Sequence, residues 1–242
     1  MDLYQYKFPQ NKLQFNKIIP QKDSYILVLF GSFNPPTIAH LRSLESISNF
    51  FKSKDKNVIG GYLSPVNTLY TQKNLESEKH RATMCDLATS SSSWIMVDKW
   101  ECTRKSYVRT FTALEHFKDE IDSLMKKKKI KTNIKIPYLC GQDIIDSMIE
   151  PNGFWVEERV LRMISKFGLI VVQREDPLPS KKLEQKIKST FLNDVKDKIE
   201  ICESPVESST LARSLIKKNL SAKYLLADPV IDYIKRNQLY RL

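Results

Sequence analysis

The amino-acid sequence predicts an α/β fold, a doubly wound and mostly parallel β-sheet with helices at its C-terminal end. Two observations lead to this prediction. Short hydrophobic runs alternate with segments of helical periodicity along almost the whole chain. The first of these runs, residues 25–30, is hydrophobic at every position, which is typical of a strand buried on both faces of a parallel sheet.

Each element follows from a local pattern. In the N-terminal half, hydrophobic runs predict strands at residues 25–30, 58–63 and 94–97. Apolar residues at helical spacing predict helices at residues 38–51, 76–88 and 107–125. In the C-terminal half, the same criteria predict strands at 134–140, 169–172 and 199–202, and helices at 157–166, around 187–192, at 209–218 and at 230–235. Asp228 and Pro229 are expected as the N-cap and the first-turn proline of the last helix.

The longer loops are expected at residues 64–75, 126–134 and 174–182. Residues 1–23 are polar, and we expect them to form an N-terminal extension, disordered in part. Residues 24–242 are expected to form a single domain, since the alternation of strands and helices runs through them without a break.

Composition excludes several classes of protein. The 242 residues are 41% hydrophobic and 28% charged, as in ordinary globular proteins. None of the four cysteines forms a C-x-x-C pair, which argues against a zinc site or a disulfide framework and favours a reducing compartment. The start of the chain lacks the apolar stretch of a signal peptide, and no apolar run approaches the roughly 20 residues of a membrane span. We therefore expect an intracellular protein, cytoplasmic or nuclear.

The net charge of +11 raises the question of nucleic-acid binding. The excess is concentrated in residues 99–135, which hold 11 Lys or Arg against 5 Asp or Glu. Its densest part runs from Lys126 to Lys131, and its first interpretation is a solvated linker after a helix. Binding of RNA or DNA and a nuclear import signal remain alternatives for this lysine run.

The first candidate site follows the first strand, at residues 31–40. Gly31 allows a sharp turn close to a ligand, and two prolines stiffen that turn. A helix begins near Thr37, so its free N–H groups and positive dipole end are expected to face the crevice at the sheet edge. His40 lies in the first turn of this helix, off its apolar stripe. The pattern predicts a phosphate-binding site with His40 directed into it.

The second candidate site is the start of the helix predicted from Ser209. Ser208 or Ser209 can cap this helix, and Thr210 adds a hydroxyl group. Arg213 lies one turn further on and can bind phosphate oxygens bidentately. Alone, this pattern is that of an ordinary capped helix with a surface arginine.

Taken together, the two sites resemble a known superfamily. Gly31-Ser-Phe-Asn-Pro-Pro-Thr-x-x-His40 resembles the signature of the nucleotidylyltransferases, and Thr37 stands where the eukaryotic nicotinamide mononucleotide adenylyltransferases also have threonine. Ser208-Ser-Thr-x-x-Arg213 is similar to the adenylyltransferase motif that binds the ATP triphosphate. The resemblance implies the Rossmann-like nucleotidylyltransferase fold.

Further stretches resemble the eukaryotic-type nicotinamide/nicotinic acid mononucleotide adenylyltransferases, in order, from about Tyr25 onward. They are residues 61–66 with Tyr70, Lys73 and His80-Arg81, residues 97–101, residues 140–143 with 151–155, and residues 224–229. One departure is the stretch after Tyr70, where Lys73 alone remains of several lysines that relatives use for the mononucleotide phosphate.

The resemblance assigns roles to individual residues. His40 and Arg213 are the expected catalytic residues. The expected ATP-binding residues are Gly31, Ser32, Phe33, Thr37, His40, Gly141, Asp143, Ser208, Ser209, Thr210 and Arg213. The expected mononucleotide-binding residues are Ser32, Phe33, Lys73, Trp100, Phe154 and Trp155, with Trp100 and Trp155 on either side of the pyridine ring. Asp143 could equally be an N-cap for residues 144–148. No protein metal ligand is expected, and Mg²⁺ would bind mainly through ATP phosphates.

The implied reaction joins ATP to nicotinamide or nicotinic acid mononucleotide, giving a dinucleotide of NAD biosynthesis and pyrophosphate. The mononucleotide phosphate is already largely an anion at neutral pH, so direct in-line attack on the ATP α-phosphate needs no protein base. One alternative is another nucleotidylyltransferase, acting on phosphopantetheine or a phospho-alcohol. A second is a non-catalytic nucleic-acid-binding protein. No membrane or specific nucleic-acid partner is expected, a homo-oligomer is compatible with the sequence, and the choice between amide and acid mononucleotide stays open.

Overall fold

The computed structural model describes residues 6–20, 22–69, 75–151, 153–174, 179–204 and 208–240. Within them the chain forms a seven-stranded sheet of order β3-β2-β1-β5-β6-β7, in which β4 pairs with β1 and all pairings are parallel. The strands are β1 (Ser24–Gly31), β2 (Asn57–Pro65), β3 (Ile95–Val97), β4 (Ile134–Lys135), β5 (Tyr138–Gly141), β6 (Leu169–Arg174) and β7 (Ile199–Ser204). The predicted doubly wound, parallel sheet is therefore confirmed.

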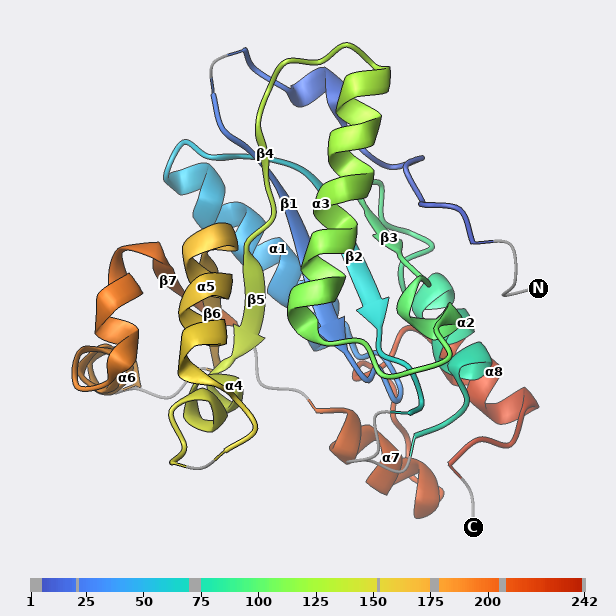
Figure 1. The fold of residues 1–242 in the computed structure, drawn as a ribbon. Coiled ribbons are helices and arrows are strands. Elements are labelled where there is room, and N and C mark those ends of the chain that lie inside the picture. Colours follow the sequence, from blue (N-terminus) through green and yellow to red (C-terminus); the bar gives the residue numbers. More distant parts are fainter. Residues whose placement is uncertain are drawn as a thin grey trace.

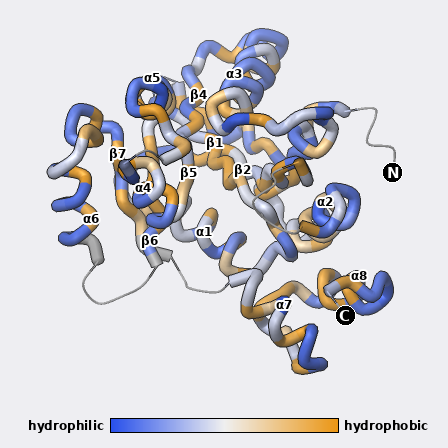
Figure 2. The backbone as a smooth tube through the Cα atoms, turned by 60° about the horizontal axis from the view of Figure 1, so that its bottom comes forward, coloured by the Kyte–Doolittle hydropathy of each residue, from blue (hydrophilic) through white to orange (hydrophobic). Residues whose placement is uncertain are grey.

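Helices cover both faces of this sheet (Figure 1). They are α1 (Ile38–Ser53), α2 (Glu78–Ala88), α3 (Thr110–Lys127), α4 (Gln142–Met148), α5 (Glu157–Phe167), α6 (Pro179–Lys188), α7 (Ser209–Lys217) and α8 (Asp228–Arg236), with 3₁₀ segments η1 (Phe15–Lys17), η2 (Glu101–Thr103) and η3 (Phe191–Lys198). Helices α3 and α5 lie on one face and α1 on the other. Helices α7 and α8 lie together beyond the sheet and pack against α2 (Figure 2).

The central strand β1 shows why the first hydrophobic run has no polar position. Ile26 and Val28 point into the core under α3 and α5, whereas Tyr25 and Leu27 point into the core under α1. All four are buried. Because both faces of the strand are covered, an alternation of polar and apolar residues would place polar groups in a core.

Two glycines inside β2 are explained by their neighbours on the two faces. A Cβ atom on Gly60 would lie 2.4 Å from Leu13 Cδ2, and one on Gly61 would lie 2.7 Å from Trp94 Cζ3. Trp94 is held in place because its indole N–H donates to Glu45 Oε1 at 2.9 Å. The glycines therefore allow two large side chains to approach the strand backbone.

The N-terminal segment differs from the expected disordered extension. Phe8 and Leu13 are buried in the main core, although most residues around them are polar. The hydroxyl of Tyr62 donates to the Pro9 carbonyl at 2.7 Å, and Lys12 Nζ donates to the carbonyl of Ile95 at 3.0 Å. Residues 6–20 are thus packed onto the sheet as part of the domain.

Several predicted boundaries also shift. The strand expected at residues 134–140 divides into β4 and β5 around Pro137, which has no N–H to donate to a neighbouring strand. Helix α3 runs on to Lys127, so the lysine run begins in a helix rather than in a linker. Ala227, not Asp228, is the N-cap of α8, and the Asp228 carboxylate accepts a hydrogen bond from Lys223 Nζ at 2.5 Å instead. The helix expected around residues 187–192 is interrupted between α6 and η3.

Among the helices of the described residues, none has the length and apolar character needed to cross a membrane.

Candidate active site

The strand order reverses between β1 and β5, the two central strands of the sheet. In open α/β sheets, ligands bind at such a switch point, outside the carboxyl ends of the strands. The turn at residues 31–36 leaves β1 at this edge, and Gly141 ends β5 beside it. The first predicted site therefore lies at the position that the sheet topology favours for a ligand.

His40 is held by the first turn of α1. Thr37 is the N-cap of this helix, and its backbone N–H donates to His40 Nδ1 at 2.9 Å. Since Nδ1 accepts this hydrogen bond, the proton of the neutral imidazole lies on Nε2. The ring also packs edge-on against Phe33, with 5.1 Å between the ring centroids. The arrangement fixes both the orientation of the ring and the nitrogen that can donate to a ligand.

The expectation of free N–H groups at the start of α1 is only partly met. The N–H of Ile38 donates to the Leu225 carbonyl at 2.8 Å, and the N–H of Thr37 is used by His40. The C-terminal loop thus satisfies a backbone donor that a phosphate could otherwise have bound. The site retains the positive dipole end of α1 and the donor on His40.

The turn after β1 is held by Arg81, a buried residue for which the sequence pattern predicted no role. Arg81 is fully buried, and its guanidinium donates to the carbonyls of Ser32 at 2.8 Å, Glu76 at 2.9 Å and Val66 at 2.5 Å. These bonds fix the backbone of Ser32, next to Phe33, which has a φ of +44°. A signal was present in the sequence, because Arg81 lies on the same helix face as the buried residues Met84, Cys85 and Ala88.

The second motif docks directly onto this turn. Ser208 caps α7, since its side chain accepts from the N–H of Leu211 at 3.2 Å. The Ser209 hydroxyl donates to the Pro35 carbonyl at 2.8 Å, and Arg213 Nη1 donates to the Asn34 carbonyl at 2.7 Å. The two pairs are 174 and 179 positions apart in the sequence. The structure therefore brings the two predicted phosphate motifs into one site.

Asn34 also links the turn to the C-terminal end of the domain. Its side-chain oxygen accepts from the hydroxyl of Tyr240 at 2.8 Å and from the N–H of Glu76 at 3.2 Å. Within α7, Arg213 Nη2 donates to Thr210 Oγ1 at 3.1 Å, which orients the guanidinium along the helix. Asn34 and Tyr240 were not among the predicted site residues, and both act by holding the turn in shape.

Gly141 and Asp143 lie at the end of β5. Gly141 is the N-cap of α4, so the alternative role of Asp143 as the N-cap of this helix is wrong. Asp143 lies in the first turn, where a negative charge interacts favourably with the helix dipole. A Cβ on Gly141 would lie 2.4 Å from Asp143 Oδ1, so the carboxylate folds back over the strand end.

Three of the aromatic residues predicted to bind the pyridine mononucleotide, Trp100, Phe154 and Trp155, differ from one another in burial and contacts. Trp100 is half-buried and stacks on His116, with ring centroids 4.1 Å apart and planes inclined by 4°. Trp155 is also half-buried, packs against the main core, and donates its indole N–H to Ser147 Oγ at 3.0 Å. Phe154 is 90% exposed. Lys73 and Tyr70 lie outside the described residues.

Two buried carboxyl groups lie at the ends of β2 and β3. Asp98 follows β3 and is fully buried, and Glu101 accepts a hydrogen bond from the Ser64 hydroxyl at 2.8 Å. Burial raises the pKa of Glu101 to about 7, although the Ser64 hydrogen bond favours its charged form. Within the described chain, no group of three or more His, Cys, Asp or Glu side chains is arranged to hold a metal ion.

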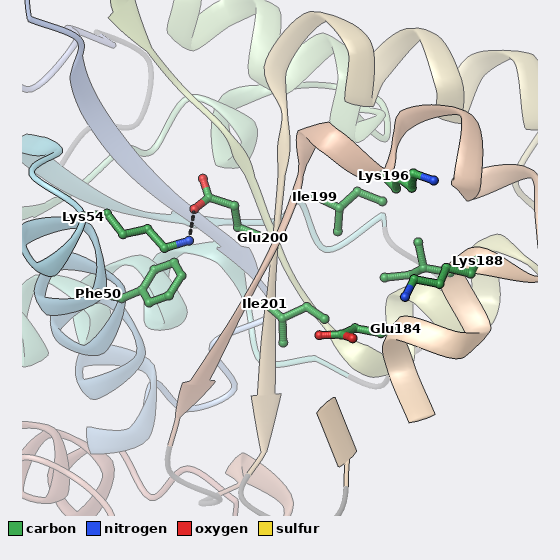
Figure 3. Close-up of a pocket in the computed structure, with 9 residues that line it drawn as sticks. Phe50, Lys54, Glu184, Lys188, Lys196, Ile199, Glu200 and Ile201 are labelled. Atoms are coloured by element: carbon green, nitrogen blue, oxygen red, sulfur yellow. Dashed lines mark hydrogen bonds and ion pairs between the residues drawn. The ribbon is translucent and has the colours of Figure 1, made fainter. Parts of the chain in front are cut away.

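A cavity elsewhere in the domain is a weaker candidate (Figure 3). It lies beside Ile199 and Ile201 of β7 and near the C-terminal end of α1, where Lys54 Nζ donates to Glu200 Oε2 at 3.0 Å. Residues at the amino end of a parallel strand are on the opposite edge from the expected ligand site. The switch point therefore remains the better candidate.

Comparisons with known proteins identify the family of the chain. Residues 28–195 match the family model described as cytidylyltransferase-like. An Arabidopsis thaliana protein named nicotinamide/nicotinic acid mononucleotide adenylyltransferase is 36% identical over 236 residues, covering 96% of each chain. A protein of the same name from Oryza sativa subsp. japonica is 39% identical over 221 residues, covering 89% of this chain and 86% of its own. A Caenorhabditis elegans protein of that name, numbered 2, is 36% identical over 222 residues, covering 89% and 97%.

Proposed function

The chain belongs to the cytidylyltransferase-like family and, within it, to the nicotinamide/nicotinic acid mononucleotide adenylyltransferases, and from this premise we propose that it acts at the junction of α1 and α7. It transfers the adenylyl group of ATP to a pyridine mononucleotide, a step of NAD biosynthesis. The observation that supports this location most directly is the docking of Ser209 and Arg213 onto the carbonyls of Pro35 and Asn34. It joins the turn that precedes His40 to the helix that carries the Arg213 cation, around the position where the triphosphate would lie.

The chemistry requires positioning rather than a protein base. An oxygen of the mononucleotide phosphate forms a bond to the α-phosphorus of ATP, and the bond from that phosphorus to the bridging oxygen of pyrophosphate breaks. The attacking phosphate has a second pKa of about 6, so it is already largely ionised at neutral pH. We place the Nε2–H of His40 against the α-phosphate oxygens, where negative charge develops in the transition state. The Thr37 hydrogen bond supports this role because it fixes the donor in advance.

The leaving pyrophosphate would lie at the N-terminus of α7. Ser208 caps this helix, and Thr210 and Arg213 present hydroxyl and guanidinium donors along it, whereas the Ser209 hydroxyl donates its hydrogen to the Pro35 carbonyl. Arginine binds phosphate oxygens through several N–H groups at once. Gly141 ends β5 and Asp143 follows in the first turn of α4, and in this proposal they bind the ribose hydroxyls of ATP. Mg²⁺ enters this proposal as part of the MgATP substrate, bound to phosphate oxygens and water.

The pyridine mononucleotide would lie on the opposite side of the turn. The backbone of Ser32 and Phe33 borders this space, and its shape depends on the carbonyl bond from Arg81. Trp100 and Trp155 supply ring surfaces, although both already contact protein. His116 stacks on the Trp100 ring, the Arg104 guanidinium lies 5.0 Å from its centroid, and Trp155 packs against the main core. Aromatic stacking of this kind contributes about 1 kcal/mol beyond the burial of area.

The test is pyrophosphate release from ATP and Mg²⁺ with three acceptors in parallel. These are nicotinamide mononucleotide, nicotinic acid mononucleotide and phosphopantetheine. Release with either pyridine nucleotide is the expected result, and the ratio of kcat/KM between them gives the preference that the sequence leaves open. Release with phosphopantetheine alone would contradict the assigned acceptor, and the absence of release with any of the three from folded protein would contradict the proposal.

A further inference from the structure

A buried hydrogen-bond network lies behind the Trp100 ring. The Tyr6 hydroxyl is 2.8 Å from Asp98 Oδ1 and 2.9 Å from His116 Nε2. The side chain of Asp98 is fully buried, and that of His116 is 9% exposed. Three distant segments therefore meet here, namely the N-terminal segment, the loop after β3 and helix α3.

The proton positions follow from the chemistry of the three groups. Tyr6 has a single hydroxyl hydrogen, and burial next to Asp98 raises the pKa of that hydroxyl, so it stays protonated and donates to the carboxylate. The Tyr6 oxygen can then only accept, so the hydrogen on His116 Nε2 points at it. Asp98 Oδ2 lies 3.5 Å from the same nitrogen and has no hydrogen-bond partner among the described residues.

His116 transmits this arrangement to Trp100. The two rings are parallel, with centroids 4.1 Å apart. The edge of the His116 ring is also packed against Tyr6 and Phe8, with centroids 5.6 Å and 6.1 Å away. Because the imidazole is confined on several sides, a change in its tilt must move the indole that is stacked on it.

We propose that Tyr6, Asp98 and His116 are positioning residues that fix the plane of the Trp100 ring, so that the N-terminal segment completes the mononucleotide subsite. The inference rests on the proposed function, in which Trp100 contacts the pyridine ring. Without the Tyr6 hydroxyl, the buried Asp98 carboxylate would attract the His116 N–H across the 3.5 Å gap. The imidazole would then tilt, and the indole would lose its alignment with the substrate.

The test measures KM for the mononucleotide and for ATP separately, on the full chain. Tyr6→Phe should raise KM for the mononucleotide about tenfold, as expected for a lost buried hydrogen bond, and should leave KM for ATP within about twofold. His116→Ala should have a similar effect, and His116→Phe should restore part of it because a flat ring again supports the indole. A matched control is Tyr62→Phe, which removes a hydroxyl that donates to the Pro9 carbonyl of the same segment rather than to Tyr6, Asp98 or His116.

A double-mutant cycle with Trp100→Ala separates this inference from the proposed function. If Tyr6 acts through Trp100, adding Tyr6→Phe to Trp100→Ala should change KM for the mononucleotide by less than about twofold. An unchanged KM for the mononucleotide in folded Tyr6→Phe, or an equal rise in the KM values for mononucleotide and ATP, would overturn the positioning role. A rise in Tyr62→Phe as large as that in Tyr6→Phe would overturn it too. An unchanged KM in Trp100→Ala itself would instead refute the placement of the mononucleotide.

Discussion

Replacement of His40 separates the structural role of this residue from its catalytic role. Thr37-x-x-His40 is a capping box in which histidine takes the place usually held by Glu or Gln. His40→Ala removes the acceptor of the Thr37 N–H, and Thr37 is only 1% exposed, so water cannot readily replace it. We expect the free energy of unfolding to fall by about 1–2 kcal/mol.

The catalytic loss should be larger. If His40 Nε2–H donates to the transition state, its removal should lower kcat by about 10²–10³, which corresponds to roughly 3–4 kcal/mol. His40→Gln is the matched control, because glutamine at this position can accept from the Thr37 N–H and restore the capping box. It should therefore recover the stability lost in His40→Ala without recovering turnover.

The assay combines urea unfolding with pyrophosphate release at saturating ATP and mononucleotide. Stability and kcat should vary independently across wild type, His40→Ala and His40→Gln. A folded His40→Ala whose kcat is within about fivefold of wild type would refute the catalytic role. A kcat that follows stability through all three proteins would show that His40 acts only as a cap.

Three further predictions concern charge, packing and the second motif. Since the pKa of Glu101 is about 7 when folded and 4.5 ordinarily, the folded state retains a proton between these pH values that the unfolded state has lost. The free energy of unfolding should therefore fall by about 3 kcal/mol as pH rises through this window. In Glu101→Gln, the free energy of unfolding measured with urea should depend less steeply on pH. The same pH dependence in Glu101→Gln and wild type would contradict the burial effect. Gly61→Ala should lower the free energy of unfolding by about 1–3 kcal/mol, because the new Cβ would meet Trp94 at 2.7 Å. The double mutant with Trp94→Leu should lose less stability than the sum of the two single mutants. Strictly additive losses would contradict the contact. Arg213→Lys should reduce kcat/KM for ATP by about 10²-fold, since a single ammonium replaces a fork of donors; equal activity would remove Arg213 from the site.

The lysine run of residues 126–131 has a local explanation. Lys126 and Lys127 occupy the last turn of α3, where positive charge interacts favourably with the helix dipole. Lys128 Nζ lies 4.6 Å from the centre of the Phe15 ring. These contacts account for part of the patch without a nucleic acid.

The sequence by itself determined the features that depend on neighbours three or four positions away. Alternating hydrophobic periodicity was enough for the order of strands and helices. Because a cap is formed within one turn, the sequence limited the cap of α7 to Ser208 or Ser209, and the structure has Ser208 in that role. His40 could be placed in the first turn of α1 for the same reason.

Only the tertiary structure decided how distant segments meet. Arg213 contacts Asn34, Arg81 supports the Ser32 carbonyl, and Tyr6 reaches Asp98, each across a long stretch of chain. Nothing in the local pattern of a polar N-terminal segment predicts that Phe8 and Leu13 are buried, because their partners lie on β2 and α3. Such contacts form only where the folded sheet and its helices bring two surfaces together. Packing across the whole domain decides which surfaces meet, and the spacing of neighbouring residues does not.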